Sequence, residues 1–213
     1  MLVRIIFRRF VAGSALVFII VWFSIGLQVS SYKNDIVEAT RYQPFASIVA
    51  YLHTQAPAQS VVLADPAFTA TEVMIYTQDF VYDGGEADAT FQVPQSRLAH
   101  DYFVWLALQG VTAQSVRQYI YQRDNRSEIG YLFFNGVHWR DQCGWAGCFP
   151  DSVLENLIPQ YQAFLKTPLL QNIKKYKVDY LLVDAKANGN WNLSQLPLTE
   201  VAASGDFTLY SFK

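Results

Sequence analysis

The stretch "KVDYLLVD", residues 177–184, decides the fold of this chain. Its apolar residues follow one another almost without interruption, a pattern typical of a buried strand. Strands of this kind occur in sheets that are covered by helices. We therefore expect residues 177–184 to form a strand within an α/β domain.

Two further strands are expected upstream. "SVVLAD", residues 60–65, is a short apolar run, and "DFVYDGG", residues 79–85, is a β-prone run closed by a glycine turn. Between them, Thr69 and Glu72 form a capping box that opens a helix from residue 70 to about residue 76. Strands that alternate with helices predict a largely parallel sheet.

The chain ends in a predicted hairpin. "TEVAASGDFTLYSFK", residues 199–213, contains two β-prone runs joined at Ser204–Gly205–Asp206. The fold class predicted is α/β: an N-terminal transmembrane helix, then a small, largely parallel sheet with flanking helices and an antiparallel C-terminal edge.

Several helices are expected around this sheet. Phe45, Ile48, Val49 and Leu52 are spaced as on one helical face, and "SRLAHDYFVWLALQG", residues 96–110, ends in a C-cap glycine. After residue 110, the sequence signals for helices are the residues expected at their N-terminal ends.

Thr112 is expected to cap a helix over residues 113–124. Ser152 and Glu155 form another capping box, and Pro159 is expected to kink or divide the helix that follows. Thr167 and Pro168 are expected to begin one more helix.

The first 32 residues predict on which side of the membrane the rest of the chain lies. Residues 10–32 carry no charge, and about 20 apolar residues are enough to cross a bilayer. Arg4, Arg8 and Arg9 precede this run, so the positive-inside rule places the N-terminus in the cytoplasm. The alternative is a cleaved signal peptide with "VSS", residues 29–31, at its cleavage site. Both interpretations export the rest of the chain.

Composition agrees with this organisation. Charged residues make up 16% of the chain, well below the usual quarter, which favours a membrane segment. All 18 acidic residues follow residue 10, as do 13 of the 16 basic ones, so residues 10–213 carry a net charge of −5. A surface of this charge argues against nucleic-acid binding.

The predicted domain order follows from these observations. It comprises a cytoplasmic basic flank at 1–9, a transmembrane helix at 10–32, a connector at 33–43 and an extracytoplasmic α/β domain at 44–213. The predicted location is the cell membrane, crossed once, with the lipid bilayer as a partner.

The only two cysteines lie in "HWRDQCGWAGC", residues 138–148. A zinc site needs four ligands, and Cys143, Cys148 and His138 supply three at most. Outside the membrane, two thiols so close in sequence are expected to pair. We expect a Cys143–Cys148 disulfide, with unpaired structural thiols and metal or redox chemistry as the alternatives.

Two groups of residues are candidates for ligand contact. Asp65 and Asp184 follow or end predicted strands, where open α/β sheets bind ligands, although acids there also make turns. Trp139 and Trp145 lie in an aromatic-rich loop that suits sugar stacking, although such loops also serve packing. No dinucleotide, phosphate-loop or nucleophile-elbow motif occurs in residues 33–213, so we expect no cofactor and no metal.

The order of these segments resembles the C-terminal part of GT-C-type polytopic membrane glycosyltransferases and related multi-pass proteins. The segments that carry the resemblance are residues 45–66, 76–85, 174–184 and 205–212. The resemblance implies a last membrane helix followed by an extracytoplasmic α/β domain.

The resemblance also implies that the catalytic half is missing. In such transferases the catalytic acid lies in an early extracytoplasmic loop beside a polyprenyl-phosphate sugar donor. Here no acid precedes Asp35, so no catalytic residue is carried over. We expect either a piece of a larger protein or a single-span relative.

Three functions are compatible with these expectations. The first is a non-catalytic extracytoplasmic domain of a glycosyltransferase-like membrane protein, which positions a polyprenyl-linked sugar or an acceptor. The second is a stand-alone single-pass protein whose outer domain binds an envelope protein. The third is an envelope hydrolase that uses Asp65 or Asp184.

Overall fold

The computed structural model describes residues 22, 25, 40–64, 73–75, 77–82, 94–122, 129 and 151–213. These residues belong to two compact units, Met1–Pro44 and Phe45–Lys213. Within the segment predicted to span a membrane, Trp22 and Ile25 are described, and both are helical and exposed. Among the described helices, none has the length and apolar character needed to cross a bilayer. The membrane helix at 10–32 stays a prediction.

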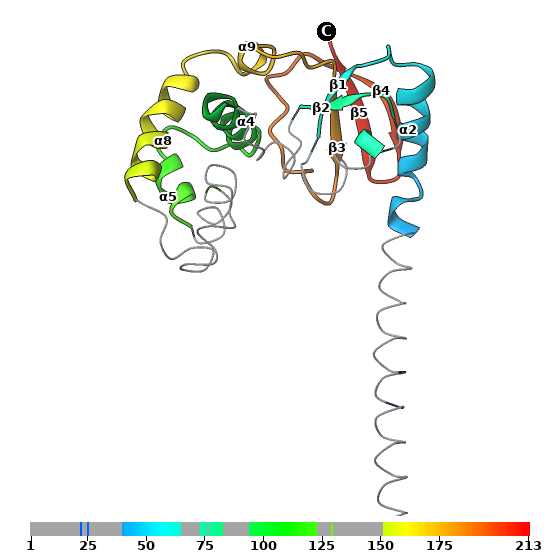
Figure 1. The fold of residues 1–213 in the computed structure, drawn as a ribbon, viewed down its shortest axis with the longest axis horizontal. Helices are drawn as coiled ribbons and strands as arrows, with labels where there is room; N and C mark the ends of the chain where they lie inside the picture. Colours follow the sequence, from blue (N-terminus) through cyan, green and yellow to red (C-terminus); the bar gives the residue numbers. More distant parts are fainter. Residues whose placement is uncertain are drawn as a thin grey trace, which may run out of the picture. The chain divides into compact units, whose positions relative to one another are not determined.

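Five strands form one sheet in the order β2-β1-β3-β5-β4 (Figure 1). They are β1 Val61–Leu63, β2 Phe80–Val81, β3 Tyr180–Asp184, β4 Leu198–Ser204 and β5 Phe207–Phe212. β1 pairs in parallel with β2 and β3, whereas β5 pairs antiparallel with β3 and β4.

The sheet is therefore mixed, which corrects the expectation of a largely parallel one. The reason is that the last hairpin contributes two complete strands, and β5 pairs with β3 along the whole length of β3. The predicted antiparallel C-terminal edge is confirmed, because β4 lies at the end of the sheet and pairs only with β5 among the described strands.

β3 is the central strand, and all of its residues are buried. Leu181 and Val183 point to one face of the sheet, where they belong to one apolar cluster. Leu182 points to the other face, beside its cross-strand partner Leu209. The continuous apolar run in the sequence thus reflects burial on both sides.

Helix α2, Phe45–Thr54, packs on β4 and β5 and reaches Tyr180 of β3 with the Tyr51 ring, so it covers the face of the sheet that carries Leu182. Its buried residues are Phe45, Ile48 and Leu52, as the helical spacing predicts. The Phe45 ring meets Phe207 of β5 edge-on, with 5.1 Å between ring centres. The expected amphipathic helix is confirmed.

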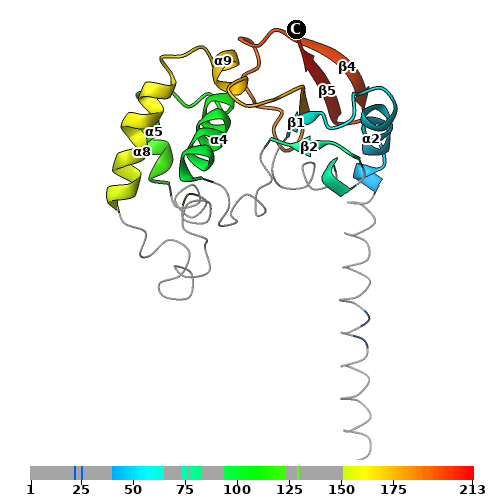
Figure 2. The ribbon, with the colours of Figure 1, turned by 45° about the horizontal axis from the view of Figure 1, so that its top comes forward.

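Helices α4, Gln95–Leu108, and α9, Leu169–Ile173, cover the opposite face. Val104 and Leu108 of α4 pack with Ile173 of α9 against Leu181 and Val183 of β3. Figures 1 and 2 place α2 and α4 on opposite sides of the sheet. The Phe45–Lys213 unit is therefore layered helix, sheet, helix.

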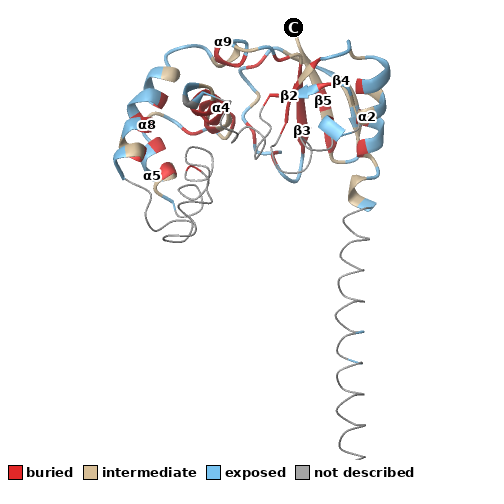
Figure 3. Cartoon of the chain, in the orientation of Figure 1, coloured by how far each residue is buried: buried red, intermediate tan, exposed pale blue. Residues whose placement is uncertain are grey.

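A second apolar core lies between α4, α5, Val116–Ile120, and α8, Asp151–Phe164. Phe103, Leu106 and Tyr161 are among its members, and the buried faces of these helices turn toward one another in Figure 3. The packing explains why α4 is apolar on more than one side, since it serves both cores.

Three predictions about the helices are corrected, one of them wholly and two in part. Helix α8 already includes Ser152, and Glu155 accepts hydrogen bonds from Arg117 (2.7 Å) and Tyr121 (2.6 Å) instead of closing a capping box. Pro159 is exposed and does not divide the helix, which is continuous across it. Thr112 makes the expected capping hydrogen bond, since its Oγ1 accepts the Ser115 N–H at 3.1 Å, but the α-helix that follows is only Val116–Ile120 instead of residues 113–124.

Two aspartates attach the neighbouring parallel strands to the start of β1. Asp79, before β2, accepts the Ser60 N–H at 3.0 Å, and Asp179, before β3, accepts the Val61 N–H at 2.8 Å. Asp79 is 5% exposed. Burial raises the pKa of its carboxyl, and the nearby Asp179 adds to the shift.

We predict that Asp79→Asn becomes more stable relative to the unchanged protein as pH rises. A carboxyl whose pKa is raised in the folded state, from 3.8, binds more protons folded than unfolded. It contributes stability below pH 3.8 that is lost as pH rises through the folded-state pKa. Asn retains an acceptor for Ser60 and does not titrate. Urea unfolding of the full chain in detergent from pH 4 to pH 7 measures the difference.

The matched control is Glu200→Gln, which changes an exposed carboxylate on β4. Its effect on the free energy of unfolding should vary little over the same pH range. A constant difference between Asp79→Asn and the unchanged protein would contradict the prediction.

Candidate functional site

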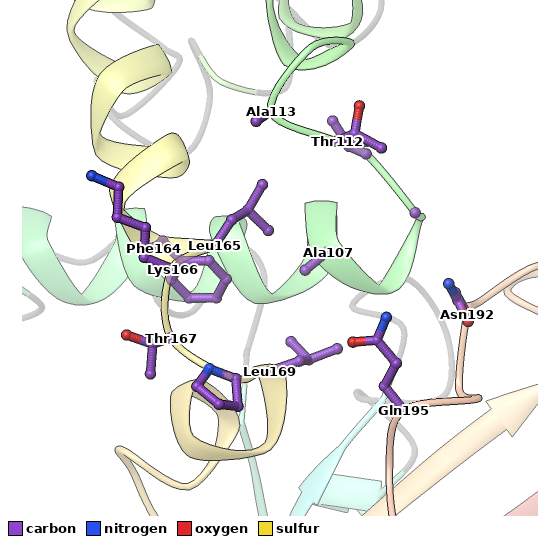
Figure 4. Close-up of a pocket in the computed structure, with 13 residues that line it drawn as sticks. Ala107, Thr112, Ala113, Phe164, Leu165, Lys166, Thr167, Leu169, Asn192 and Gln195 are labelled. Carbon is purple, nitrogen blue, oxygen red and sulfur yellow. The ribbon is translucent and has the colours of Figure 1, made fainter.

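Three connections between elements meet around an open groove in the Phe45–Lys213 unit (Figure 4). They are the α4–α5 link, the α8–α9 link and the loop between β3 and β4. The groove encloses about 590 Å³ and is lined by residues 107, 110–113, 164–169, 192 and 195. This volume lies within the ~300–1,000 Å³ typical of sites for small organic ligands.

The α4–α5 link is shaped by a glycine. Gly110 has a φ of +74°, a left-handed conformation that glycine adopts without a Cβ penalty. Its N–H donates to Ala107 O, and the next N–H, of Val111, donates to Leu106 O, which ends α4. The Tyr161 hydroxyl then donates to Val111 O at 2.7 Å and fixes the link against α8.

The α8–α9 link is held by one buried amide. Asn172 Nδ2 donates to Phe164 O at 2.9 Å and to Thr167 O at 3.2 Å. His100 Nε2 lies 2.8 Å from Asn172 O, and because a carbonyl only accepts, this nitrogen carries a proton. The His100 ring also packs edge-on against Phe164. The link is thereby tied to α4.

The loop after β3 is anchored at both ends. Asp184 Oδ1 accepts the Lys186 N–H at 2.9 Å, and Asn188 Oδ1 accepts the Asp184 N–H at 2.7 Å. Farther on, the Asn192 N–H donates to Leu108 O at 2.7 Å. The last contact brings the β3–β4 loop to the C-terminal end of α4, where it forms one side of the groove.

The groove is suited to binding and poorly equipped for reaction. Among the described lining residues, Lys166 is the only ionisable side chain, and there is no carboxylate, thiol or imidazole. Its apolar wall includes Phe164, Leu165 and Leu169, while Asn192 and Gln195 supply amides. Such a lining can orient a ligand through hydrogen bonds and apolar contact.

A buried ion pair lies elsewhere on α4. Arg97 Nε is 2.8 Å from Asp101 Oδ2, and the Arg97 guanidinium also donates to Tyr82 O at 2.7 Å. The guanidinium stacks over the rings of Tyr82 and Tyr176, at 4.3 and 3.7 Å from their centres. Burial and the Asp101 charge raise the pKa of Tyr82, so its phenol stays neutral. The cluster fastens the end of β2 to α4.

Of the residues predicted as sites from the sequence, the structure describes Asp184, which is not among the residues that line the groove. Asp184 is buried and serves the turn after β3, while Asp65, the cysteines Cys143 and Cys148 and the tryptophans Trp139 and Trp145 lie outside the described residues. The crevice, the disulfide and the aromatic loop remain predictions. β1 and β3 are neighbours, so their carboxyl ends do share one edge of the sheet.

Sequence reasoning missed the groove residues because they follow no motif. Asn192 and Gln195 lie between the predicted strand at 177–184 and the predicted hairpin at 199–213. The pattern that signals this region is the sequence Thr167–Pro168 between two helices, together with Gly110 after a long helix, since both mark sharp connections.

Comparisons with protein families, curated proteins and solved structures find no match to this chain. Among the described residues, no three His, Cys, Asp or Glu side chains are grouped as a metal site requires.

We predict that Asn172→Ala lowers the free energy of unfolding by about 2 kcal/mol. The change removes two hydrogen bonds of a buried amide and leaves two carbonyls without that donor. Denaturant unfolding of the full chain measures the loss. Asn190→Ala is the matched control, because that side chain is exposed and makes one hydrogen bond, to Gln109. Equal losses in the two variants would contradict the role given to Asn172.

We also predict that His100 makes the fold sensitive to acid. Burial lowers the pKa of His100 below its ordinary 6.5, and Lys175 and Arg97 lower it further. The folded state then binds fewer protons than the unfolded state, so stability is present above pH 6.5 and is lost as pH falls below it. The unchanged protein should lose more stability between pH 7 and pH 5 than His100→Gln.

His53→Gln is the control for this titration, since His53 is exposed on α2. It should follow the unchanged protein across the range. The role of His100 is refuted if His100→Gln and His53→Gln show the same pH dependence.

Proposed function

We propose that this chain supplies a non-catalytic extracytoplasmic domain to a membrane glycosyltransferase-like protein, in which residues 45–213 position a polyprenyl-linked sugar or its acceptor. The observation that carries the proposal is the groove between the α4–α5, α8–α9 and β3–β4 connections. It is large enough for a small organic ligand, and its described lining offers amides and apolar walls in place of acids, thiols or imidazoles.

The sequence supports the same function. An uncharged run at residues 10–32 behind three arginines predicts a chain anchored in the cell membrane with its larger part outside. A domain tethered in this way keeps its ligand site at a high local concentration near lipid-linked substrates. The resemblance to the last segments of GT-C-type proteins adds the class of reaction.

The buried polar residues favour a structural role over catalysis. Asp184 and Asn188 exchange hydrogen bonds within one turn, and Arg97 is paired with Asp101. A hydrolase would need a carboxylate that reaches substrate. Asp184 instead accepts backbone N–H groups, so we do not assign it a catalytic role.

One observation favours a protein partner as a second candidate. Met74, Ile75 and Phe80 are exposed apolar residues, and Phe80 belongs to β2, which is an edge strand among the described strands of the sheet. An exposed edge with apolar side chains can accept another chain. In this case the outer domain would bind an envelope protein, and Phe80→Ser would weaken that complex without changing ligand binding in the groove.

The proposed function predicts a specific kinetic effect. The test uses membranes from cells of the source organism whose protein carries Ala107→Leu, a substitution that fills the groove. The concentration of polyprenyl-phosphate sugar donor that gives half the maximal rate of transfer should rise. The maximal rate should stay within about twofold, because a positioning site contributes to binding and not to the chemical step. Asp184→Asn should leave both quantities close to those of the unchanged protein.

Two results would contradict the proposal. One is a rate of sugar transfer that stays the same when the gene for this chain is deleted or when the chain carries Ala107→Leu. The other is a reporter fused after Lys213 that responds as a cytoplasmic protein. A loss of maximal rate in Asp184→Asn, with fold retained, would instead favour a catalytic role for Asp184.

A further inference from the structure

We infer that the groove binds an uncharged sugar ring and not a phosphate, an inference that rests on the proposed function and names the part of the substrate that the domain holds. The site involved is formed by Asn192 and Gln195 on one side and by Phe164, Leu165 and Leu169 on the other. Figure 4 shows these side chains around one space.

The polar side of the groove matches hydroxyl groups. A carboxamide donates through its nitrogen and accepts through its oxygen, and a sugar hydroxyl also does both. In Figure 4 the Gln195 amide extends toward Leu169 and Ala107, and within the described contacts it makes no hydrogen bond to the chain. The Asn192 Oδ1 accepts the Ser194 hydroxyl at 2.7 Å, which leaves its Nδ2 donors available.

The apolar side of the groove matches the C–H faces of a sugar. Leu165 is 36% exposed although it is a large apolar residue, and Phe164 is half-buried against His100, Phe103 and Tyr161. A ligand that covers Leu165 and the outer side of Phe164 removes apolar surface from water. A ring with polar edges and apolar faces satisfies both sides of the groove together.

The charge of the groove argues against a phosphate. A phosphate accepts hydrogen bonds and calls for several donors or cations. Lys166 is the one cation among the described lining residues, and in Figure 4 its side chain extends away from Gln195 and Asn192. At the amide end, Asn192 and Gln195 are neutral and supply no positive charge to balance a phosphate. A neutral polyol needs no such charge.

The backbone around the groove is also held in place before any ligand arrives. Asn172 fixes the backbone of Phe164 and Thr167, and Leu108 accepts the Asn192 N–H. Ordering these loops on binding therefore costs little, which allows weak individual contacts to give measurable affinity.

The test is ligand titration of the full chain in a detergent without a sugar headgroup. The probes are the methyl glycosides of glucose, galactose, mannose and N-acetylglucosamine, with inorganic phosphate in parallel, followed by NMR of the Gln, Asn and Leu side chains. At least one glycoside should bind at the groove, and phosphate should neither bind there nor compete. A neutral glycolipid in nanodiscs then tells a lipid-linked sugar from a free one.

Two variants and one control sharpen this test. Gln195→Ala should weaken glycoside binding about tenfold, the equivalent of one good hydrogen bond, and Ala107→Leu should abolish it by filling the groove. Gln118→Ala, an exposed glutamine on α5 outside the groove, should change nothing. Circular dichroism checks that each variant is folded.

The inference is overturned if phosphate binds in the groove and depends on Lys166, if no glycoside binds, or if binding is the same in Gln195→Ala and Ala107→Leu as in the unchanged protein. These outcomes differ from a failure of the proposed function. Glycoside binding without any effect on transfer in membranes would refute the function and keep the ligand. An effect of the groove variant on transfer without glycoside binding would refute the ligand and keep the function.

Discussion

The burial of β3 on both faces is the constraint on which the rest of the structure depends. Its five residues are all buried, so each face needs a cover. α2 supplies one cover through Phe45, Ile48 and Leu52, and α4 with α9 supplies the other. The groove results from the packing of α4 and α9 on β3. The connections that surround it leave α4, enter α9 and leave β3.

Much of this framework could be predicted from the sequence, because apolar periodicity is a local signal. The apolar run at 177–184 gave β3, the spacing of Phe45, Ile48 and Leu52 gave α2, and Ser204–Gly205–Asp206 gave the hairpin. The helix ends were less predictable. Ser152 and Glu155 have the spacing of a capping box, but Arg117 and Tyr121 are brought to Glu155 only by the fold, and their hydrogen bonds decide its position.

The groove could not be predicted for a related reason. Gly110, Phe164 and Gln195 lie far apart in the chain and share no motif. What brings them together is a set of contacts between backbone and side chain, such as Tyr161 to Val111 O and Asn172 to Phe164 O, that sequence patterns do not encode. The residues that did attract attention, among them Asp184, have the turn chemistry that was the competing interpretation.

The hydrogen bond between Asp179 and the Val61 N–H spans 118 positions of the chain, and it has a consequence for the order in which the protein forms. β1 and the two-residue β2 are synthesised before β3, the strand that pairs with β1 on its other side. Closing so long a loop carries an entropic cost that slows folding. β1 and β2 must therefore wait until β3 has been made before this side of the sheet can form.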